Sequence, residues 1–162
     1  MRRGTLQVLL LCLVSLACGV AWGLEPGSPE DVLGRYLESL KTGKFDVSYD
    51  LVSSGMRQGK SKEQYVKESQ AMMGVADVKI FDFTVYPAKI EGDKALVPNI
   101  LESQDRFVNT LGLTEHELYT LVREGGAWKV DAQTLIEAPD EPKWFPRKPD
   151  AKPAQPPDPS SH

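Results

Sequence analysis

Few side chains in this sequence have the types and spacing that catalysis or metal binding would need. His116 is the only histidine in the part of the chain expected to fold, because His162 is the C-terminal residue. No second histidine, cysteine or group of acids accompanies His116 at ligand spacing, so the sequence predicts no metal site. It also lacks a glycine-rich phosphate loop, a serine nucleophile elbow and an HExxH segment, and we expect no cofactor.

Two aspartates are the candidates for general acid–base chemistry, which needs a carboxylate in apolar surroundings that raise its pKa. Asp82 lies between Phe81 and Phe83 in an alternating segment, so the aspartate and the two phenylalanines point to opposite faces. Asp131 alternates in the same way with Val130. If the apolar faces are buried, both carboxylates are solvated, and the sequence predicts no catalytic residue.

The element that would position these side chains is a β-hairpin over residues 115–137. Apolar and polar residues alternate along both halves, and the pair Gly125-Gly126 between them reverses the chain. A half-buried hairpin of this kind needs further strands or helices against its apolar face. We predict that Trp128 and Val130 belong to the structural core.

Three helices are predicted before the strands. The first begins at Ser28, which can cap free amides, and ends before Gly43. A shorter helix is predicted over residues 45–52 from its apolar spacing. The third begins with a capping box at residues 61–64 and ends at Gly74.

Two more strands are predicted between the helices and the hairpin, over residues 78–90 and 95–103. Pro87 and Pro98 interrupt them, and because proline lacks a backbone donor, we expect this end of the sheet to be kinked or unpaired. Three helices followed by four antiparallel strands predict an α+β domain over residues 26–137, with the helices packed on one face of a strongly bent sheet.

The first 23 residues are typical of a secretory signal peptide, with two arginines before an apolar run from Leu6 to Val20. Small residues flank Trp22, so we expect cleavage after Gly23. The run is short for a retained membrane anchor, which needs about 20 residues. An alternative is lipoprotein processing at Cys18, and we expect membrane attachment only if Cys18 is acylated.

The cysteine count bears on where the protein resides. Cys12 and Cys18 are the only cysteines, so the processed chain would contain no disulfide. Since Asn-x-Ser/Thr sequons are absent too, we expect export to a bacterial envelope, periplasmic or secreted. Removing Arg2 and Arg3 takes the basic count from 19 to 17 against 23 acidic residues, a net charge of −6. An acidic domain without a basic stripe is a poor nucleic-acid binder.

Residues 138–162 have a different composition, since eight of the 12 prolines lie between Pro139 and His162. This composition predicts a disordered Pro-rich tail without helix or central strand. Trp144 and Phe145 stand in this tail between basic residues. Two interpretations stay open: the aromatic pair folds back onto the domain, or it forms a short docking motif.

The layout resembles the nuclear transport factor 2-like superfamily of cystatin-like α+β folds, and within it the small exported bacterial domains of unknown function. The resemblance covers about residues 26–137 and rests on EDVLGRYLESLKTGKFDVSYDLVSSGMR, SKEQYVKES, IEGDKALV and LVREGGAWKVD. It implies a cone, in which a strongly bent antiparallel sheet wraps around the first helix. It also implies an apolar pocket between helices and sheet, and a homodimer through the sheet.

Isomerase-like members of that superfamily use an aspartate base with a tyrosine or a protonated acid as oxyanion donor. The resemblance therefore makes Asp82 or Asp131, acting with Tyr36, the candidates for an isomerase, dehydratase or hydrolase; Tyr49 is a further tyrosine. The apolar residues available to line a pocket contain no such acid–base pair: they are Leu33, Tyr36, Leu37, Tyr65, Met72, Phe81 and Phe83.

Three functions stay open at this point. We favour an exported, non-enzymatic envelope protein whose pocket binds a small apolar ligand or whose sheet face binds an envelope protein. The first alternative is the small enzyme just described. The second is an interaction module that acts through its Pro-rich tail.

Overall fold

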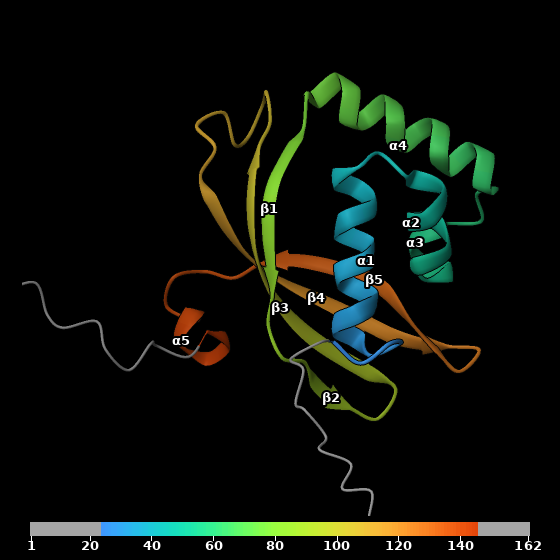
Figure 1. Ribbon diagram of the computed structural model, residues 1–162, viewed down its shortest axis with the longest axis vertical. Coiled ribbons are helices and arrows are strands. Elements are labelled where there is room, and N and C mark those ends of the chain that lie inside the picture. Colours follow the sequence, from blue (N-terminus) through green and yellow to red (C-terminus); the bar gives the residue numbers. More distant parts are fainter. Residues whose placement is uncertain (1–23, 146–162) are drawn as a thin grey trace, which may run out of the picture.

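The structure, a computed structural model, describes residues 24–145. As predicted, the fold is α+β, with the helices of residues 29–76 on one side of a bent antiparallel sheet (Figure 1). The described part has five strands where four were predicted. In chain order the elements are α1 (Pro29–Lys41), α2 (Phe45–Leu51), α3 (Ser54–Arg57), α4 (Lys62–Ala76), β1 (Lys79–Val85), β2 (Lys89–Glu91), β3 (Lys94–Gln104), β4 (Thr114–Glu124), β5 (Ala127–Leu135) and α5 (Glu141–Trp144).

Helix α1 is the element around which the sheet bends (Figure 1). Ser28 caps its first turn by accepting the Asp31 amide at 3.1 Å, and Pro29 stands where a missing amide does no harm. The helical spacing of apolar residues gives α1 one buried face, formed by Val32, Leu33, Tyr36 and Leu37.

Helix α4 starts with the predicted capping box. The Gln64 amide donates to the Ser61 hydroxyl at 3.3 Å, and the Ser61 amide donates to the Gln64 side chain at 3.0 Å. The helix continues past its predicted end at Gly74, because Asp77 adopts the left-handed conformation that closes it. It packs against α2, and none of its residues is fully buried. Much of the α4 surface therefore stays accessible.

The strand order is β1-β3-β4-β5, with β2 paired to β3 beyond the end of β1. The predicted strand over residues 78–90 is split at Pro87, which cannot donate to the ladder. Pro98 lies within an unbroken β3 and pairs regularly with Leu118 on one side, but on its other side β3 has no strand partner between the ends of β1 and β2, so the expected loss of pairing occurs on that side only. The Pro98 carbonyl accepts the Tyr86 amide at 2.9 Å. The nitrogen of Pro98, which carries no hydrogen, points to the same side as this carbonyl and therefore faces the gap between β1 and β2. No strand acceptor there requires a hydrogen bond from it.

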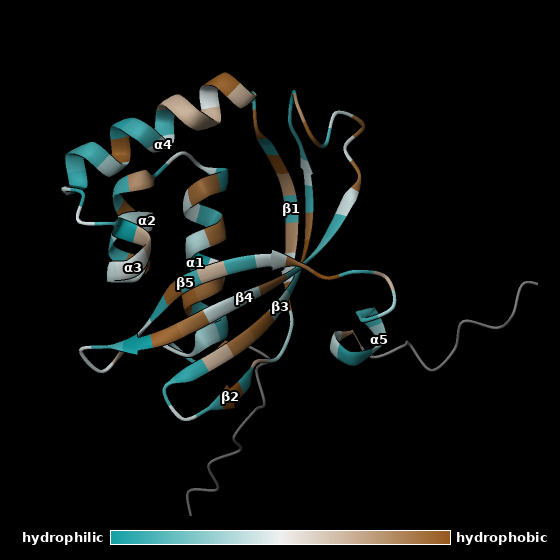
Figure 2. Cartoon of the chain, turned by 180° about the vertical axis from the view of Figure 1, so that it is seen from behind, coloured by the Kyte–Doolittle hydropathy of each residue, from teal (hydrophilic) through white to brown (hydrophobic). Residues whose placement is uncertain are grey.

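The core lies between α1, α2 and the inner face of the sheet. Hydrophobic residues run along β3, β4 and β5 (Figure 2), and alternation sends every second one inward. Trp128 and Val130 of β5 are both buried there, and Trp128 is 4% exposed. Val52, just after α2, forms a bridge to Val130 and so ties the helices to the edge of the sheet.

The C-terminal segment differs from the prediction. Residues 141–144 form one helical turn, α5, although the proline-rich composition predicted no helix; Pro142 occupies the first turn, where its amide is not needed. Phe145 packs against Tyr86 and His116, with ring centroids 4.9 Å apart in both pairs. The interpretation that the aromatic pair folds back onto the domain is confirmed.

Residues 1–23 and 146–162 lie outside the described part of the chain. The signal peptide, the alternative acylation of Cys18 and the rest of the Pro-rich tail fall there and stay predictions. Among the helices of residues 24–145, none is both long enough and apolar enough to cross a membrane.

Candidate functional site

Two neighbouring groups of side chains make up the candidate site. The first lines a cavity of about 270 Å³ between α1, α2, α3 and α4, which we call the helix cavity. Aromatic, thioether and aliphatic side chains dominate its lining, as in most small-molecule pockets. The lining residues are Tyr36, Leu40, Phe45, Met56, Gln58, Lys60, Tyr65, Glu68, Ser69, Met72 and Met73.

The polar groups of the helix cavity are few and mostly paired. Lys60 and Glu68 form an ion pair at 2.6 Å, and both side chains are partly exposed, so neither charge is isolated. The Tyr65 hydroxyl lies 3.5 Å from the Ser48 hydroxyl. Burial, aided by Tyr65, raises the pKa of Tyr36. The Tyr36 phenol therefore stays protonated at neutral pH and can donate a hydrogen bond.

The second group is a polar cluster on the inner face of the sheet, in which Asn99, Glu117 and Tyr119 are buried and Gln133 is exposed. We call it the Glu117 cluster. Glu117 is 2% exposed. One of its carboxylate oxygens accepts Asn99 Nδ2 at 2.8 Å, and the other accepts Gln133 Nε2 at 2.6 Å. Three adjacent strands supply these side chains, because strand alternation brings them to one face.

Burial governs the protonation of the Glu117 cluster. It raises the pKa of Glu117, and the hydrogen bonds from Asn99 and Gln133 oppose that rise only in part. Burial and the nearby Glu117 carboxylate raise the pKa of Tyr119 well above its usual range. Within the described structure, Asn99 Oδ1 is buried without a hydrogen-bond partner. A carboxyl group with a raised pKa beside an unused acceptor suits a site that holds a proton.

Tyr36 connects the two groups. It lines the helix cavity, and its ring meets the Tyr119 ring edge-on with centroids 6.2 Å apart. Glu117 contributes to the rise in the pKa of Tyr36 but does not itself line the cavity. The arrangement therefore presents the Tyr36 phenol, rather than the Glu117 carboxylate, to a molecule in the cavity.

Replacing Glu117 with glutamine is expected to flatten the pH dependence of stability. The pKa of Glu117 is raised in the folded state, so the ionised carboxylate destabilises the fold at pH values above that pKa. Below the ordinary pKa of a glutamate the side chain is protonated in both states, and this destabilisation disappears. Glutamine stays neutral, and a flipped Asn99 can offer its free Oδ1 to the new amide. We expect Glu117→Gln to gain about 1 kcal/mol of unfolding free energy at neutral pH and almost none near pH 3.5. Urea denaturation at both pH values measures this.

Glu102→Gln, at an exposed position on the neighbouring strand β3, is the matched control and should leave the pH profile unchanged. A Glu117→Gln variant that is less stable than the parent at neutral pH would contradict the prediction. It would mean that the ionised carboxylate, through its two amide donors, stabilises the fold.

The residues predicted to line a pocket lie in different surroundings. Tyr36, Tyr65 and Met72 line the helix cavity together. Leu33 and Leu37 are instead packed in the closed core beside them, and Leu33 is 0% exposed. The helical spacing identified the inward face of α1 but not which of its positions border open space.

A β-bulge that the sequence does not reveal separates Phe81 from Phe83. The pairing of β1 with β3 shifts register between Ile80 and Asp82, which leaves Phe81 as the extra residue. Ile80, paired with the buried Ser103, therefore takes the inner face that strict alternation assigns to Phe81. Phe81 is half-exposed, whereas Phe83 packs against the core.

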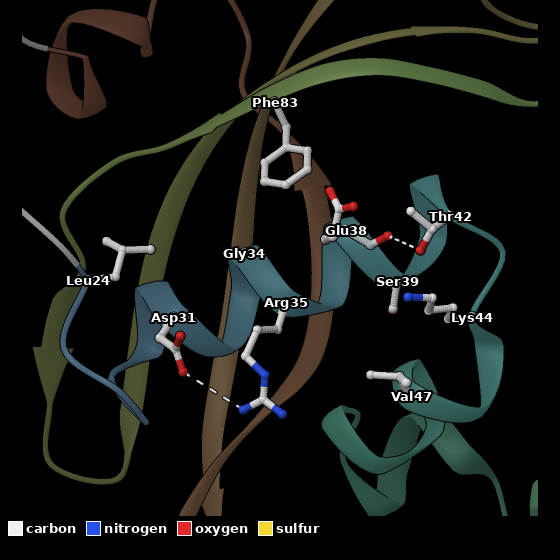
Figure 3. Close-up of a pocket in the computed structure, with 10 residues that line it drawn as sticks. All are labelled: Leu24, Asp31, Gly34, Arg35, Glu38, Ser39, Thr42, Lys44, Val47 and Phe83. Carbon is white, nitrogen blue, oxygen red and sulfur yellow. Dashed lines mark hydrogen bonds and ion pairs between the residues drawn. The ribbon is translucent and has the colours of Figure 1, made fainter.

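Phe83 also borders a second, more open groove along α1, with a volume of about 510 Å³ (Figure 3). Figure 3 shows Phe83 of β1 on one side of the helix and Val47 of α2 on the other, with Leu24 at the end of the groove. Asp31 and Arg35 lie 3.8 Å apart on its helical side. Because it is open and partly charged, this groove would bury less of an apolar ligand than the helix cavity.

The structure does not bring either candidate aspartate to Tyr36. Asp82 points away from the core on β1, where its exposed carboxylate lies 3.9 Å from the Lys41 ammonium. Asp131 accepts the Ser53 hydroxyl at 2.6 Å and so supports the residue that caps α3. Both carboxylates have local structural partners.

Glu117 is the functional candidate that sequence reasoning missed. Its signal was present, because Glu117 shares a strand face with Tyr119 and Leu121 in the predicted hairpin. A carboxylate in a row that is otherwise buried needs polar partners. Those partners, Asn99 and Gln133, come from other strands and depend on register, which the sequence does not specify.

His116 lies on the outer face of the sheet and belongs to neither group. Its Nδ1 lies 2.7 Å from Glu141 Oε1, and its ring packs beside Phe145, so it holds α5 in place. Over residues 24–145 there is no group of three or more His, Cys, Asp or Glu side chains that could hold a metal ion.

No protein-family model and no curated protein matches this chain. Among solved structures, a SEC-C motif-containing protein from Rhodopseudomonas palustris is similar, with a TM-score of 0.53 and 15% sequence identity. The match covers 68% of this chain and 80% of that protein. At this identity the similarity shows the fold alone.

NTF2-like and cystatin-like proteins are also similar. An NTF2-like protein from Cytophaga hutchinsonii gives a TM-score of 0.47 at 16% identity, over 65% of this chain and 92% of that one. A domain of unknown function with a cystatin-like fold from Nostoc punctiforme gives 0.49 at 8% identity, over 69% and 78%. Structures described as NTF2-like or cystatin-like are thus among those to which this chain is similar, in line with the resemblance read from the sequence, and the comparisons assign no activity.

Proposed function

We propose that this chain is an exported binding protein that holds a small, largely apolar molecule in the helix cavity without transforming it. The observation that carries this proposal is the cavity lining, in which aromatic and methionine side chains predominate. The charged residues of the lining, Lys60 and Glu68, are paired with each other. Such a lining binds by apolar contact, while a few polar groups fix the orientation of the ligand.

The size and polar groups of the helix cavity restrict the ligand. Its volume of about 270 Å³ lies just below the range of about 300–1,000 Å³ that is usual for ligand pockets, so the ligand is small. The protonated Tyr36 phenol can donate to a carbonyl or hydroxyl oxygen. Met56, Met72 and Met73 are flexible and adapt to irregular shapes.

Native mass spectrometry of protein purified from its own envelope tests this proposal. We expect a chain that begins at Leu24 and carries a small molecule. Ser69→Leu should lower ligand occupancy about tenfold, because Ser69 lines the cavity and overfilling a packed space typically costs about 1–3 kcal/mol.

Ala71→Leu is the matched control, since Ala71 lies two residues further along α4, is exposed and does not line the cavity. It should retain the ligand at the parent level. A parent protein with an empty cavity, or a Ser69→Leu variant that keeps the full ligand content, would contradict the proposal.

The Glu117 cluster favours a second candidate function, acid–base catalysis on the cavity ligand. Glu117, rather than Asp82 or Asp131, would then be the proton donor or acceptor. Its raised pKa supports this role. Because Glu117 does not line the cavity, the proton would have to pass through the two tyrosines that lie between them, Tyr119 and then Tyr36.

Deuterium incorporation distinguishes the two candidates. If the protein is a catalyst, ligand released after incubation in D₂O should carry deuterium at an acidic carbon, and Glu117→Gln should abolish the labelling. A binding protein should release unlabelled ligand from both the parent and the variant.

A further inference from the structure

One end of the molecule carries an unusual group of exposed hydrophobic side chains. Phe107, Val108, Leu111 and Leu113 lie in the loop between β3 and β4, and they are between 62% and 87% exposed. We call these four residues the apolar tip. Single exposed hydrophobic residues are common, but a contiguous group on one loop marks a surface that contacts something apolar.

The loop is ordered by its own polar residues. The Asp105 carboxylate accepts the backbone amides of Phe107 at 2.6 Å, Val108 at 2.7 Å and Asn109 at 3.0 Å. These bonds hold the pKa of Asp105 below its usual value. The first half of the loop therefore has a fixed shape that presents Phe107 and Val108 outward.

Asn109 fixes the shape of the second half of the loop, up to Leu113. Its side chain is buried, and its Nδ2 donates to the carbonyls of Ser103 at 2.9 Å and Leu113 at 2.7 Å. Its Oδ1 accepts the Leu113 amide at 2.7 Å. Many backbone polar groups of the loop are thus paired internally, so little free energy would be lost if water around the loop were removed.

The hydrophobic surface continues onto the C-terminal end of α4. The Arg106 amide donates to the Ala76 carbonyl at 2.8 Å, which ties the loop to this helix end. Met72 and Val75, in the last turns of α4, are also mostly exposed. Figure 2 shows hydrophobic colour at this end of α4 and on the neighbouring loop. Two elements therefore contribute to the same apolar end.

We propose that the apolar tip inserts into the interfacial layer of a lipid bilayer and holds this end of the domain against a membrane surface. The loop lies at one end of the sheet (Figure 1). Val108 and Leu113 also border a cavity of about 300 Å³, whereas Phe107 and Leu111 do not line it, so these two side chains of the apolar tip are free to enter a lipid layer. Partial insertion of apolar side chains, with the backbone paired internally, is how surface segments bind membranes without crossing them.

The charges of the loop fit a lipid surface. The acidic residue of the loop, Asp105, already accepts hydrogen bonds from three backbone amides. Its base, Arg106, is exposed beside the apolar tip, where a guanidinium can bind lipid phosphates while its stem lies along the acyl chains. The whole chain has a net charge of −4, so insertion rather than attraction to anionic lipids must supply the affinity. Zwitterionic phosphatidylcholine is therefore a suitable probe.

Tryptophan quenching by brominated phosphatidylcholine vesicles tests the proposal with the full chain. In a Phe107→Trp variant we expect the added fluorescence to fall at least about twofold when the acyl chains carry bromine. Ile90→Trp is the matched control, because Ile90 is also an exposed hydrophobic residue but lies in β2, at the other end of the molecule (Figure 1). Its added fluorescence should not change. Quenching is specific to position, so other attachment points do not affect the result.

Adding Leu111→Ser and Val108→Ser to the Phe107→Trp chain should remove most of the quenching while thermal unfolding stays unchanged, because these side chains are exposed. Absent quenching at position 107, or equal quenching at position 90, overturns the proposal. If the serine substitutions instead dissociate a dimer in sedimentation without vesicles, the apolar tip belongs to contact with a second copy of the chain, and the proposal is also overturned.

Discussion

Trp128→Ala is expected to lower the free energy of unfolding by about 3 to 5 kcal/mol. Trp128 is almost fully buried within the hydrophobic core. The neighbours cannot close the cavity that alanine would leave, because pairing with β4 and the bridge between Val52 and Val130 hold β5 in place. The Arg123 guanidinium, 4.5 Å from the indole, would also lose a cation–π contact of about 0.5–1 kcal/mol.

Chemical denaturation measures this effect, and Trp144→Ala provides the matched control. Trp144 carries the same side chain at a half-exposed position on α5, so its loss should cost less than about 1 kcal/mol. A loss well under about 1 kcal/mol for Trp128→Ala would contradict the placement of the indole in the core.

Leu33→Ala is expected to cost about 2–5 kcal/mol, the range for a buried leucine whose neighbours relax only in part. Leu33 lies on the buried face of α1 and has no exposed surface. Its backbone is held by the capped first turn of the helix, so the helix cannot easily shift to refill the space. Thermal or urea unfolding would measure the loss.

Leu135→Ala is the control, because Leu135 at the end of β5 is mostly exposed and its truncation should change stability by no more than about 0.5 kcal/mol. The comparison also separates two roles for Leu33. A stable Leu33→Ala protein that loses the cavity ligand would show that this side chain borders the helix cavity rather than the closed core.

The elements with strong local signals could be predicted from the sequence. Ser28 and the capping box at Ser61 identified the starts of α1 and α4, and the Gly125-Gly126 turn identified the hairpin of β4 and β5. In each case neighbouring residues determine the structure, because caps and tight turns depend on a few adjacent side chains.

Features that depend on contacts between distant segments could not be predicted. The bulge at Phe81 changes which residues of β1 face inward, and Pro98 is tolerated only because β1 ends beside it. The partners of Glu117 come from β3 and β5 and meet it through strand register. The candidate site therefore was predicted in part: Tyr36, Tyr65 and Met72 were named from helical spacing, whereas the Glu117 cluster was not.

The single helical turn at residues 141–144 was not predicted, for a different reason. Composition indicates whether a segment contains enough hydrophobic residues to form a core of its own. Residues 141–145 can be ordered without forming such a core. They use an existing surface, since Phe145 packs on Tyr86 and His116 bonds Glu141. A short aromatic segment can therefore be ordered despite its prolines.

The position of α5 has a consequence for self-association. The superfamily resemblance implies a homodimer through the sheet. If that dimer used the outer face, it would need surface that Phe145 and Glu141 already occupy beside His116. α5 and Phe145 thus compete with a second copy of the chain for this surface. Their effective concentration is high, because only residues 136–140 link them to β5. A second copy of the chain would have to displace α5 from this surface. The measured dimerisation constant would therefore include the free energy that it takes to release α5.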